Sequence, residues 1–199
     1  QTIKKCRIWI CRKILINTPG GTLDKALTKT EVKNILNAGL KLFAIFQETG
    51  SSAKNFTSST GKTNGQKAYD AANELDIIHG STIYFAVDFD PTDSVIKSNI
   101  IPYFESILSS YAARKYKIGV YGTRNVCHKL RNQLGINKFF VSDASYGFSG
   151  NLGYIMPDGW CFDQFKTDIT IGLDDGKVSI DKVAVSNRDK GIEYTKLTC

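Results

Sequence analysis

Residues 83–90 read IYFAVDFD, a run of β-branched and aromatic side chains that ends in two aspartates. Such a run is typical of a strand buried on both faces, as in a parallel sheet covered by helices. Asp88 and Asp90 are two positions apart, so a continuing strand places both carboxylates on one face. Because neighbouring carboxylates repel each other, we expect one of the two pKa values to be raised and that group to serve as a proton donor. The alternative is that one aspartate caps the following helix and the other is simply exposed.

The same strand-like composition recurs along the chain, with helical patterns between the runs. The best-defined helix begins at Thr28, where Glu31 completes a capping box, and ends at Gly39. Alternating strands and helices predict a parallel α/β sheet, either doubly wound or closed into a barrel. The expected strands are residues 6–16, 42–47, 82–89, 116–122, 138–144, 160–165 and 178–185, and the expected helices are residues 28–39, 64–77, 92–113 and 124–135.

Composition limits the class of protein. The chain has 199 residues, 42% of them hydrophobic, and we expect a single domain over residues 1–199. No apolar run approaches the roughly 20 residues that cross a bilayer, so we predict no membrane span. The net charge of +7 favours anionic partners. The basic residues are dispersed, however, and we predict no nucleic-acid partner.

The five cysteines stand at irregular spacing and include no CxxC pair. They predict no zinc site and leave open reduced thiols or one or two disulfides. The segment STGKTNG at residues 59–65 resembles a phosphate-binding loop, but Phe56 stands where its first glycine belongs, so we predict a polar loop instead. We predict neither a cofactor nor a bound metal.

Acidic or hydrogen-bonding residues also end the other expected strands. Glu48 closes the strand 42–47 beside Gln47, whose amide suits substrate hydroxyls. Each residue alone is ordinary, but their recurrence at strand ends predicts a site there. The candidates for substrate binding are Gln47, Tyr121, Asp143, Trp160, Asp163, Gln164 and Asp181.

The ordered segments AGLKLFAIFQ, IYFAVDFD, YKIGVYG, WCFDQF and VSIDKVAV resemble the bacterial glycoside-hydrolase-like domain of unknown function, which is similar to the family 25 muramidases. The resemblance covers about residues 10–186. It implies a TIM-barrel-like (β/α)8 fold, a site at the barrel mouth, and a cell-wall glycan or other polysaccharide as partner. Asp88, Asp90 and Glu48 match its acidic strand ends, and the aspartates of DQF and SID match its late strand ends.

Two features depart from that family. Muramidases similar to it carry Asp-x-Glu where this chain reads Asp88-Phe89-Asp90, which favours Glu48 as the proton donor. The family also opens with a strand bearing Gly-Phe-Asp, which is missing here. Seven expected strands instead of eight indicate an incomplete barrel or the loss of the first strand.

The leading hypothesis is a wall-glycan hydrolase, extracellular or associated with the cell wall. In it Glu48 is the proton donor, Asp88 the nucleophile or charge stabiliser, and Asp90 tunes both. The second hypothesis is a carbohydrate-binding or wall-anchoring module without catalysis. The third is an enzyme that binds a hard cation through Asp88 and Asp90.

Overall fold

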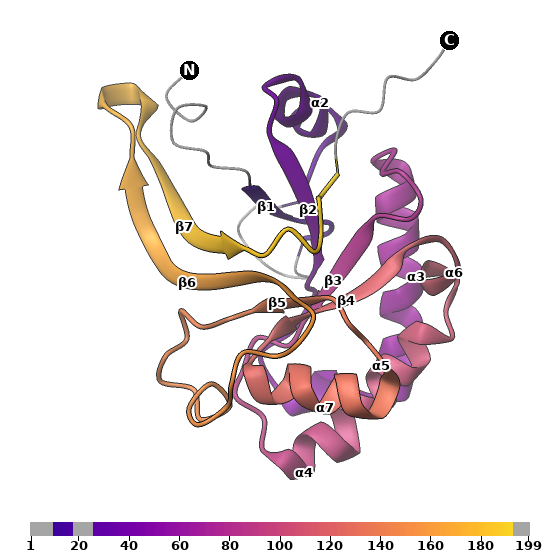
Figure 1. Ribbon diagram of the computed structural model, residues 1–199. Helices are drawn as coiled ribbons and strands as arrows, with labels where there is room; N and C mark the ends of the chain where they lie inside the picture. The colour runs from indigo at the N-terminus through magenta and orange to yellow at the C-terminus, as the bar shows by residue number, and fades with distance from the viewer. Residues whose placement is uncertain (1–9, 18–25, 193–199) are drawn as a thin grey trace.

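A curled, seven-stranded sheet forms the centre of the protein (Figure 1). The structure is a computed structural model that describes residues 10–17 and 26–192. Strands β1 to β6 run parallel in sequence order, and β7 pairs antiparallel with β6 at the edge. The strands are β1 (Ile10–Ile14), β2 (Lys41–Phe46), β3 (Thr82–Ala86), β4 (Lys117–Gly122), β5 (Phe139–Val141), β6 (Trp160–Ile171) and β7 (Val178–Val185).

The parallel strands form a half-barrel rather than a closed barrel of eight strands. This mixed α/β architecture is consistent with a TIM-barrel-like fold, and the predicted strand positions are confirmed from β2 onward. The expected strand at residues 6–16 is described only from Ile10, so its first four residues lie outside the described part. After β7 the chain returns to the sheet, where Ile192 and Leu42 exchange two backbone hydrogen bonds of 2.8 and 3.2 Å.

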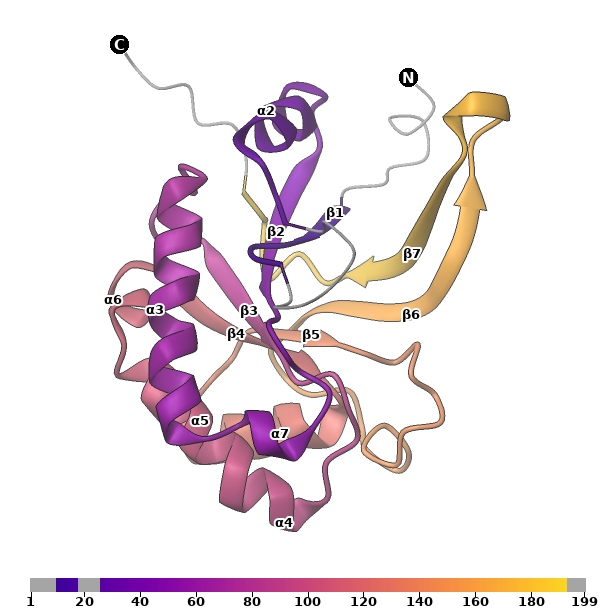
Figure 2. The same cartoon turned by 180° about the vertical axis from the view of Figure 1, so that it is seen from behind.

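Helices cover the outer face of the sheet (Figure 2). They are α2 (Lys29–Asn37), α3 (Ser58–Glu74), α4 (Asp93–Val95), α5 (Ile101–Leu108), α6 (Tyr111–Lys115) and α7 (Arg124–Leu134), with a π-helical segment at Ile96–Ile100 and 3-10 turns at Ala53–Asn55 and Asp174–Gly176. The capping box of Thr28 and Glu31 is confirmed. In the described part, no helix is long and apolar enough to span a membrane.

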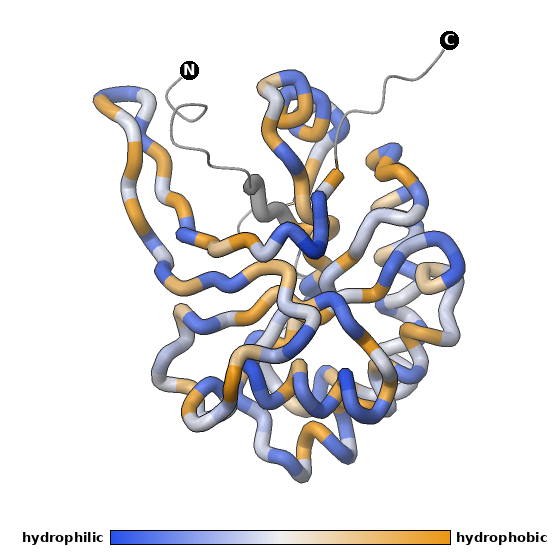
Figure 3. The backbone as a smooth tube through the Cα atoms, viewed as in Figure 1, coloured by the Kyte–Doolittle hydropathy of each residue, from blue (hydrophilic) through white to orange (hydrophobic). Residues whose placement is uncertain are grey.

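The side chains of the central strands alternate between two cores. On β2, Ala44 and Phe46 pack under the helices, whereas Phe43 and Ile45 face the inside of the half-barrel. Each of these four is at most 3% exposed, and fully burying a phenylalanine contributes about 2–3 kcal/mol. Figure 3 shows hydrophobic segments in these strands and hydrophilic ones in many of the connecting loops. The prediction of strands buried on both faces is therefore confirmed.

Helix α3 begins earlier than predicted, because residues 59–65 are helical and do not form a loop. Thr57 caps the helix reciprocally with Thr60. Gly61 and Gly65 face α5 so closely that a Cβ on Gly61 would lie 2.3 Å from the Tyr103 carbonyl oxygen. The low helix propensity of these glycines is thus offset by close packing of two helices.

Cys127 and Cys161 are buried free thiols. The side chains of Cys6, Cys11 and Cys199 lie outside the described part, so the disulfide prediction stays open for them.

Candidate functional site

The ends of β2 and β3 place an amide and a carboxylate together at the rim of the half-barrel. Gln47 directly follows β2, and its Nε2 donates a hydrogen bond of 2.9 Å to Asp88 Oδ2. The backbone N–H of Asp88 donates to the Gly50 carbonyl at 2.9 Å, which fixes the chain after β3. Asp88 is exposed. The pair therefore presents an oriented carboxylate to solvent.

A second group connects β4, β6 and β7 across the inside of the half-barrel. Tyr121 Oη donates to Gln164 Oε1 at 2.7 Å, and Gln164 Nε2 donates to Asp181 Oδ2 at 2.7 Å. Tyr121 and Gln164 are only 6% and 2% exposed. Asp181 Oδ1 also accepts from the backbone N–H of Asp168, next to an irregularity in the β6–β7 pairing. Such a network holds a phenol, an amide and a carboxylate in fixed positions on one face.

Glu48, which follows Gln47 in the chain, is engaged by the outer helix layer. Its carboxylate accepts from Lys67 Nζ of α3 at 2.5 Å, and it lines a small cavity with Asn64 and Tyr103. Gln47 lines the same cavity. Glu48 and Asp88 follow adjacent strands but have different partners, so a joint catalytic role for them stays a prediction.

Asp90 is bound to the loop that follows β5. Its Oδ2 accepts from the backbone N–H and the hydroxyl of Ser149 at 2.6 and 2.7 Å, and its Oδ1 accepts from Gly150 N–H at 2.9 Å. Burial acts to raise the pKa of Asp90, but these hydrogen bonds outweigh it and the pKa is lowered. Strand alternation does not extend to Asp88 and Asp90, because β3 ends at Ala86, and the two carboxylates have different partners.

A third acidic group lies where α7 begins. Arg124 clamps Asp143 with two guanidinium hydrogen bonds, one of 2.9 Å from Nε to Oδ1, and also donates to the Tyr154 carbonyl at 2.8 Å. Burial, reinforced by nearby Asp143, raises the pKa of Asp163 to about 6, although Arg124 acts in the opposite sense. Asp163 Oδ1 is buried without a hydrogen-bond partner. The pKa of Asp163 is therefore raised, whereas that of Asp90 is lowered.

Trp160 lies away from the rim, since it is the first residue of β6, pairs with Phe139 and packs partly buried against the outer core. Of the predicted set, the structure links Gln47 with Asp88 and, separately, Tyr121 with Gln164 and Asp181. Sequence reasoning did not identify Lys67, Arg124 or Ser149 as partners of the acids. An arginine directly after the Thr123 helix cap is the one local signal of that kind.

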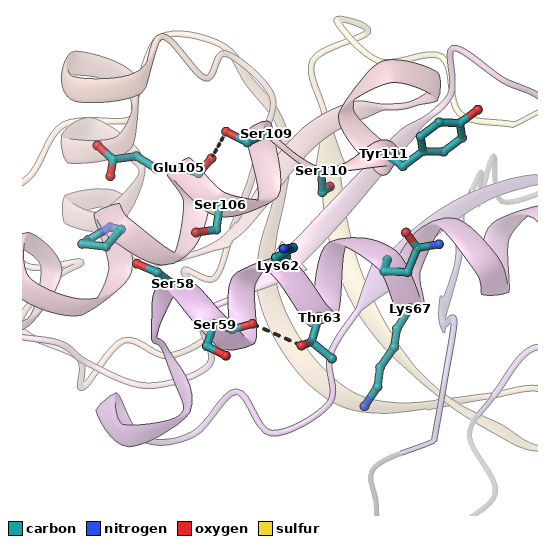
Figure 4. A pocket seen from close by; sticks show the side chains of 12 residues that line it. Ser58, Ser59, Lys62, Thr63, Lys67, Glu105, Ser106, Ser109, Ser110 and Tyr111 are labelled. Atoms are coloured by element: carbon teal, nitrogen blue, oxygen red, sulfur yellow. Dashed lines mark hydrogen bonds between the residues drawn. The ribbon is translucent and has the colours of Figure 1, made fainter.

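A separate groove lies on the outer surface between α3 and α5, with a volume of about 990 Å³ (Figure 4). Hydroxyl side chains line it from both helices, among them Ser59, Thr63 and Ser106. Except for the Glu48 partner Lys67, its lining contains no residue of the groups described above.

Residues 15–190 match the family described as the Rv2525c-like, glycoside hydrolase-like domain. The chain belongs to this family. Among curated proteins of Bacillus subtilis (strain 168), it is 45% identical to the uncharacterized protein YbfG over 184 residues and 39% identical to the uncharacterized protein FadG over 195 residues. These matches cover 88% and 96% of the chain but only 25% and 34% of the relatives, so the chain spans about a quarter to a third of their length.

Two solved structures share the fold of this Rv2525c-like domain. The Mycobacterium tuberculosis Tat-secreted protein Rv2525c, solved with L-tartrate, aligns with a TM-score of 0.76 at 19% identity over 95% of this chain and 91% of its own. The modular autolysin LytC from Streptococcus pneumoniae, solved with a synthetic peptidoglycan ligand, aligns with a TM-score of 0.53 at 8% identity over 91% of this chain and 41% of its own. At these identities the likeness establishes the fold alone.

Proposed function

We propose that this domain binds a cell-wall glycan along the inner face of the half-barrel and hydrolyses a glycosidic bond there, with Asp88 as the central carboxylate. The observation that carries the proposal is the exposed Asp88 carboxylate, held by the Gln47 amide at the rim of a glycoside hydrolase-like domain. A carboxylate in that position attacks the anomeric carbon or stabilises the positive charge that develops on the sugar ring.

The remaining inner polar groups suit a sugar ligand. Tyr121 and Gln164 are almost fully buried, so in this proposal they position Asp181, whose partly exposed carboxylate accepts hydrogen bonds from sugar hydroxyls. The peptidoglycan ligand of LytC and the secretion of Rv2525c support a cell-wall glycan as ligand and an extracellular place of action. Glu48 is a weaker candidate for the proton donor, because Lys67 engages its carboxylate on the outer side of the sheet.

The experiment compares wild type with Asp88→Asn on purified bacterial cell wall, with release of reducing ends as the readout. Asp175→Asn, which changes an exposed acid of the β6–β7 turn, is the matched control. We expect Asp88→Asn to abolish release and Asp175→Asn to retain it. Equal release by wild type and Asp88→Asn overturns the assignment of Asp88.

A binding module without catalysis is the second candidate. It is favoured by the engagement of Asp90 with Ser149 and of Glu48 with Lys67, which leaves fewer carboxylates available for acid–base chemistry. Co-sedimentation of wild type with cell wall, without any release of reducing ends, identifies this function. A cation held by Asp88 and Asp90 together has less support, because hydrogen bonds from Ser149 and Gly150 occupy both oxygens of Asp90.

A further inference from the structure

A cleft of about 430 Å³ lies at the base of the half-barrel, at the opposite ends of the strands from Asp88. Lys117 is the first residue of β4 and Lys138 immediately precedes β5, so both stand at the amino ends of parallel strands. The segment 187–191 crosses below them and adds Arg188 and Lys190 to the lining. Four basic side chains from three parts of the chain thus meet at one hollow.

The positive charge of this cleft is only partly neutralised from within. Among the described residues that line it, Asp189 is the only acid, and it offsets one of the four positive charges; its Oδ2 accepts from Tyr84 Oη at 2.7 Å and its Oδ1 from Gly191 N–H at 3.0 Å. No carboxylate among residues 10–17 and 26–192 forms an ion pair with Lys117, Lys138, Arg188 or Lys190. Four like charges around one hollow repel each other, and a bound anion relieves that repulsion.

The cleft is also held in shape. Lys138 Nζ donates to the Arg188 carbonyl at 2.6 Å, which ties the crossing segment to the start of β5. Gly191, with φ +71°, lies against the Phe43 ring so closely that a Cβ would be 2.6 Å from it. The backbone pairing of Ile192 with Leu42 secures the other end. A preformed cationic site loses little conformational entropy when it binds a ligand.

A second hollow of about 290 Å³ shares Lys117 and Lys138 with the first. The two lysines therefore stand between two neighbouring hollows, an arrangement that suits a ligand with successive negative charges more than a single ion. Arginine and lysine together favour phosphate, because the guanidinium binds its oxygens in bidentate fashion.

We propose that this basic cleft binds the phosphodiesters of a polyol-phosphate polymer of the cell wall. Single-stranded nucleic acid carries the same phosphates but is usually held by aromatic stacking as well. Among the described residues, the lining of the 430 Å³ cleft contains no phenylalanine, tyrosine or tryptophan. Tyr116 of the second hollow is only 3% exposed and packs against the His79 ring with centroids 5.4 Å apart. The choice of the cell wall as the source of the phosphates rests on the proposed function, but binding in this cleft does not depend on hydrolysis by Asp88.

The test measures binding of a synthetic glycerol-phosphate oligomer to the full chain by isothermal titration calorimetry at about 0.15 M salt, where surface charges are strongly screened. The cleft variant is Lys117→Gln with Arg188→Gln. The control, Lys33→Gln with Lys54→Gln, removes the same charge from two exposed positions elsewhere. We expect the cleft variant to bind at least tenfold more weakly and the control to bind within twofold of wild type.

Three results overturn the proposal: no binding of the oligomer by wild type, equal weakening in both variants, or tighter binding of a single-stranded oligodeoxynucleotide with the same number of phosphates. Thermal unfolding of both variants is measured in parallel. If the cleft variant does not fold, Lys190→Gln alone against Lys33→Gln alone gives the same comparison, with an expected loss of at least threefold.

Discussion

Ser149 donates two hydrogen bonds to Asp90 Oδ2, one from its backbone N–H and one from its hydroxyl. With the bond from Gly150, they attach the long loop between β5 and β6 to the segment that follows β3. Asp90 therefore joins two parts of the rim that are 59 residues apart in the chain. These hydrogen bonds give Asp90 a structural role as an anchor of the loop.

Replacing Asp90 by alanine removes all three of these bonds. Hydrogen bonds to a charged acceptor contribute more than neutral ones, so we expect the free energy of unfolding to fall by about 2–3 kcal/mol in urea denaturation. Amide exchange should accelerate at Ser149 and Gly150. Asp175→Ala is the control, and a loss no larger in Asp90→Ala than in this control contradicts the anchoring role.

The pKa of Asp163 predicts how stability depends on pH. Because burial beside Asp143 raises this pKa from 3.8 to about 6, the folded protein binds more protons here than the unfolded chain between those two values. Protonation of Asp163 therefore stabilises the folded protein. This stabilisation is fully present below pH 3.8 and is lost as the pH rises through about 6.

Asp163→Asn removes that titration. We expect the variant to match wild type near pH 4 and to exceed its free energy of unfolding by about 1 kcal/mol at pH 7.5, after allowance for the partly exposed site. Urea denaturation across this range measures the difference. A gap between Asp163→Asn and wild type that is independent of pH shows that Asp163 does not titrate in this way.

Gln47 offers a test of how Asp88 is oriented. Gln47→Leu keeps the size of the side chain but removes the hydrogen bond to Asp88, so we expect release of reducing ends from cell wall to fall about tenfold with little change in thermal unfolding. Gln66→Leu is a matched control, since Gln66 donates a similar bond of 2.8 Å to Asp70 on the outer surface of α3. Equal activity of the two variants argues against a positioning role for Gln47.

Local pattern predicted the strands, the cap of α2 and the burial of β2 and β3 on both faces, because each depends on residues close in the chain. The local pattern predicted the surroundings of the acidic residues less well. Side chains alternate between the two faces only within a strand, and Asp88 and Asp90 follow the end of β3. Their partners Gln47 and Ser149 come from distant segments of the chain. The raised pKa of Asp163 likewise depends on burial beside Asp143, which the sequence does not specify.

Gly61 shows how a distant contact overrides propensity. In an exposed helix, glycine to alanine stabilises by about 1 kcal/mol, so the intrinsic preference of α3 favours Gly61→Ala. Here the added Cβ would meet the Tyr103 carbonyl of α5 at 2.3 Å, and backbone cannot move aside as a flexible side chain can. The helices must separate, at a cost of about 1–3 kcal/mol for overpacking. We therefore expect a lower melting temperature for Gly61→Ala, against no more than a small change for Ser59→Ala at an exposed position of the same helix. A melting temperature at or above that of wild type would mean that α3 and α5 are not in this close contact.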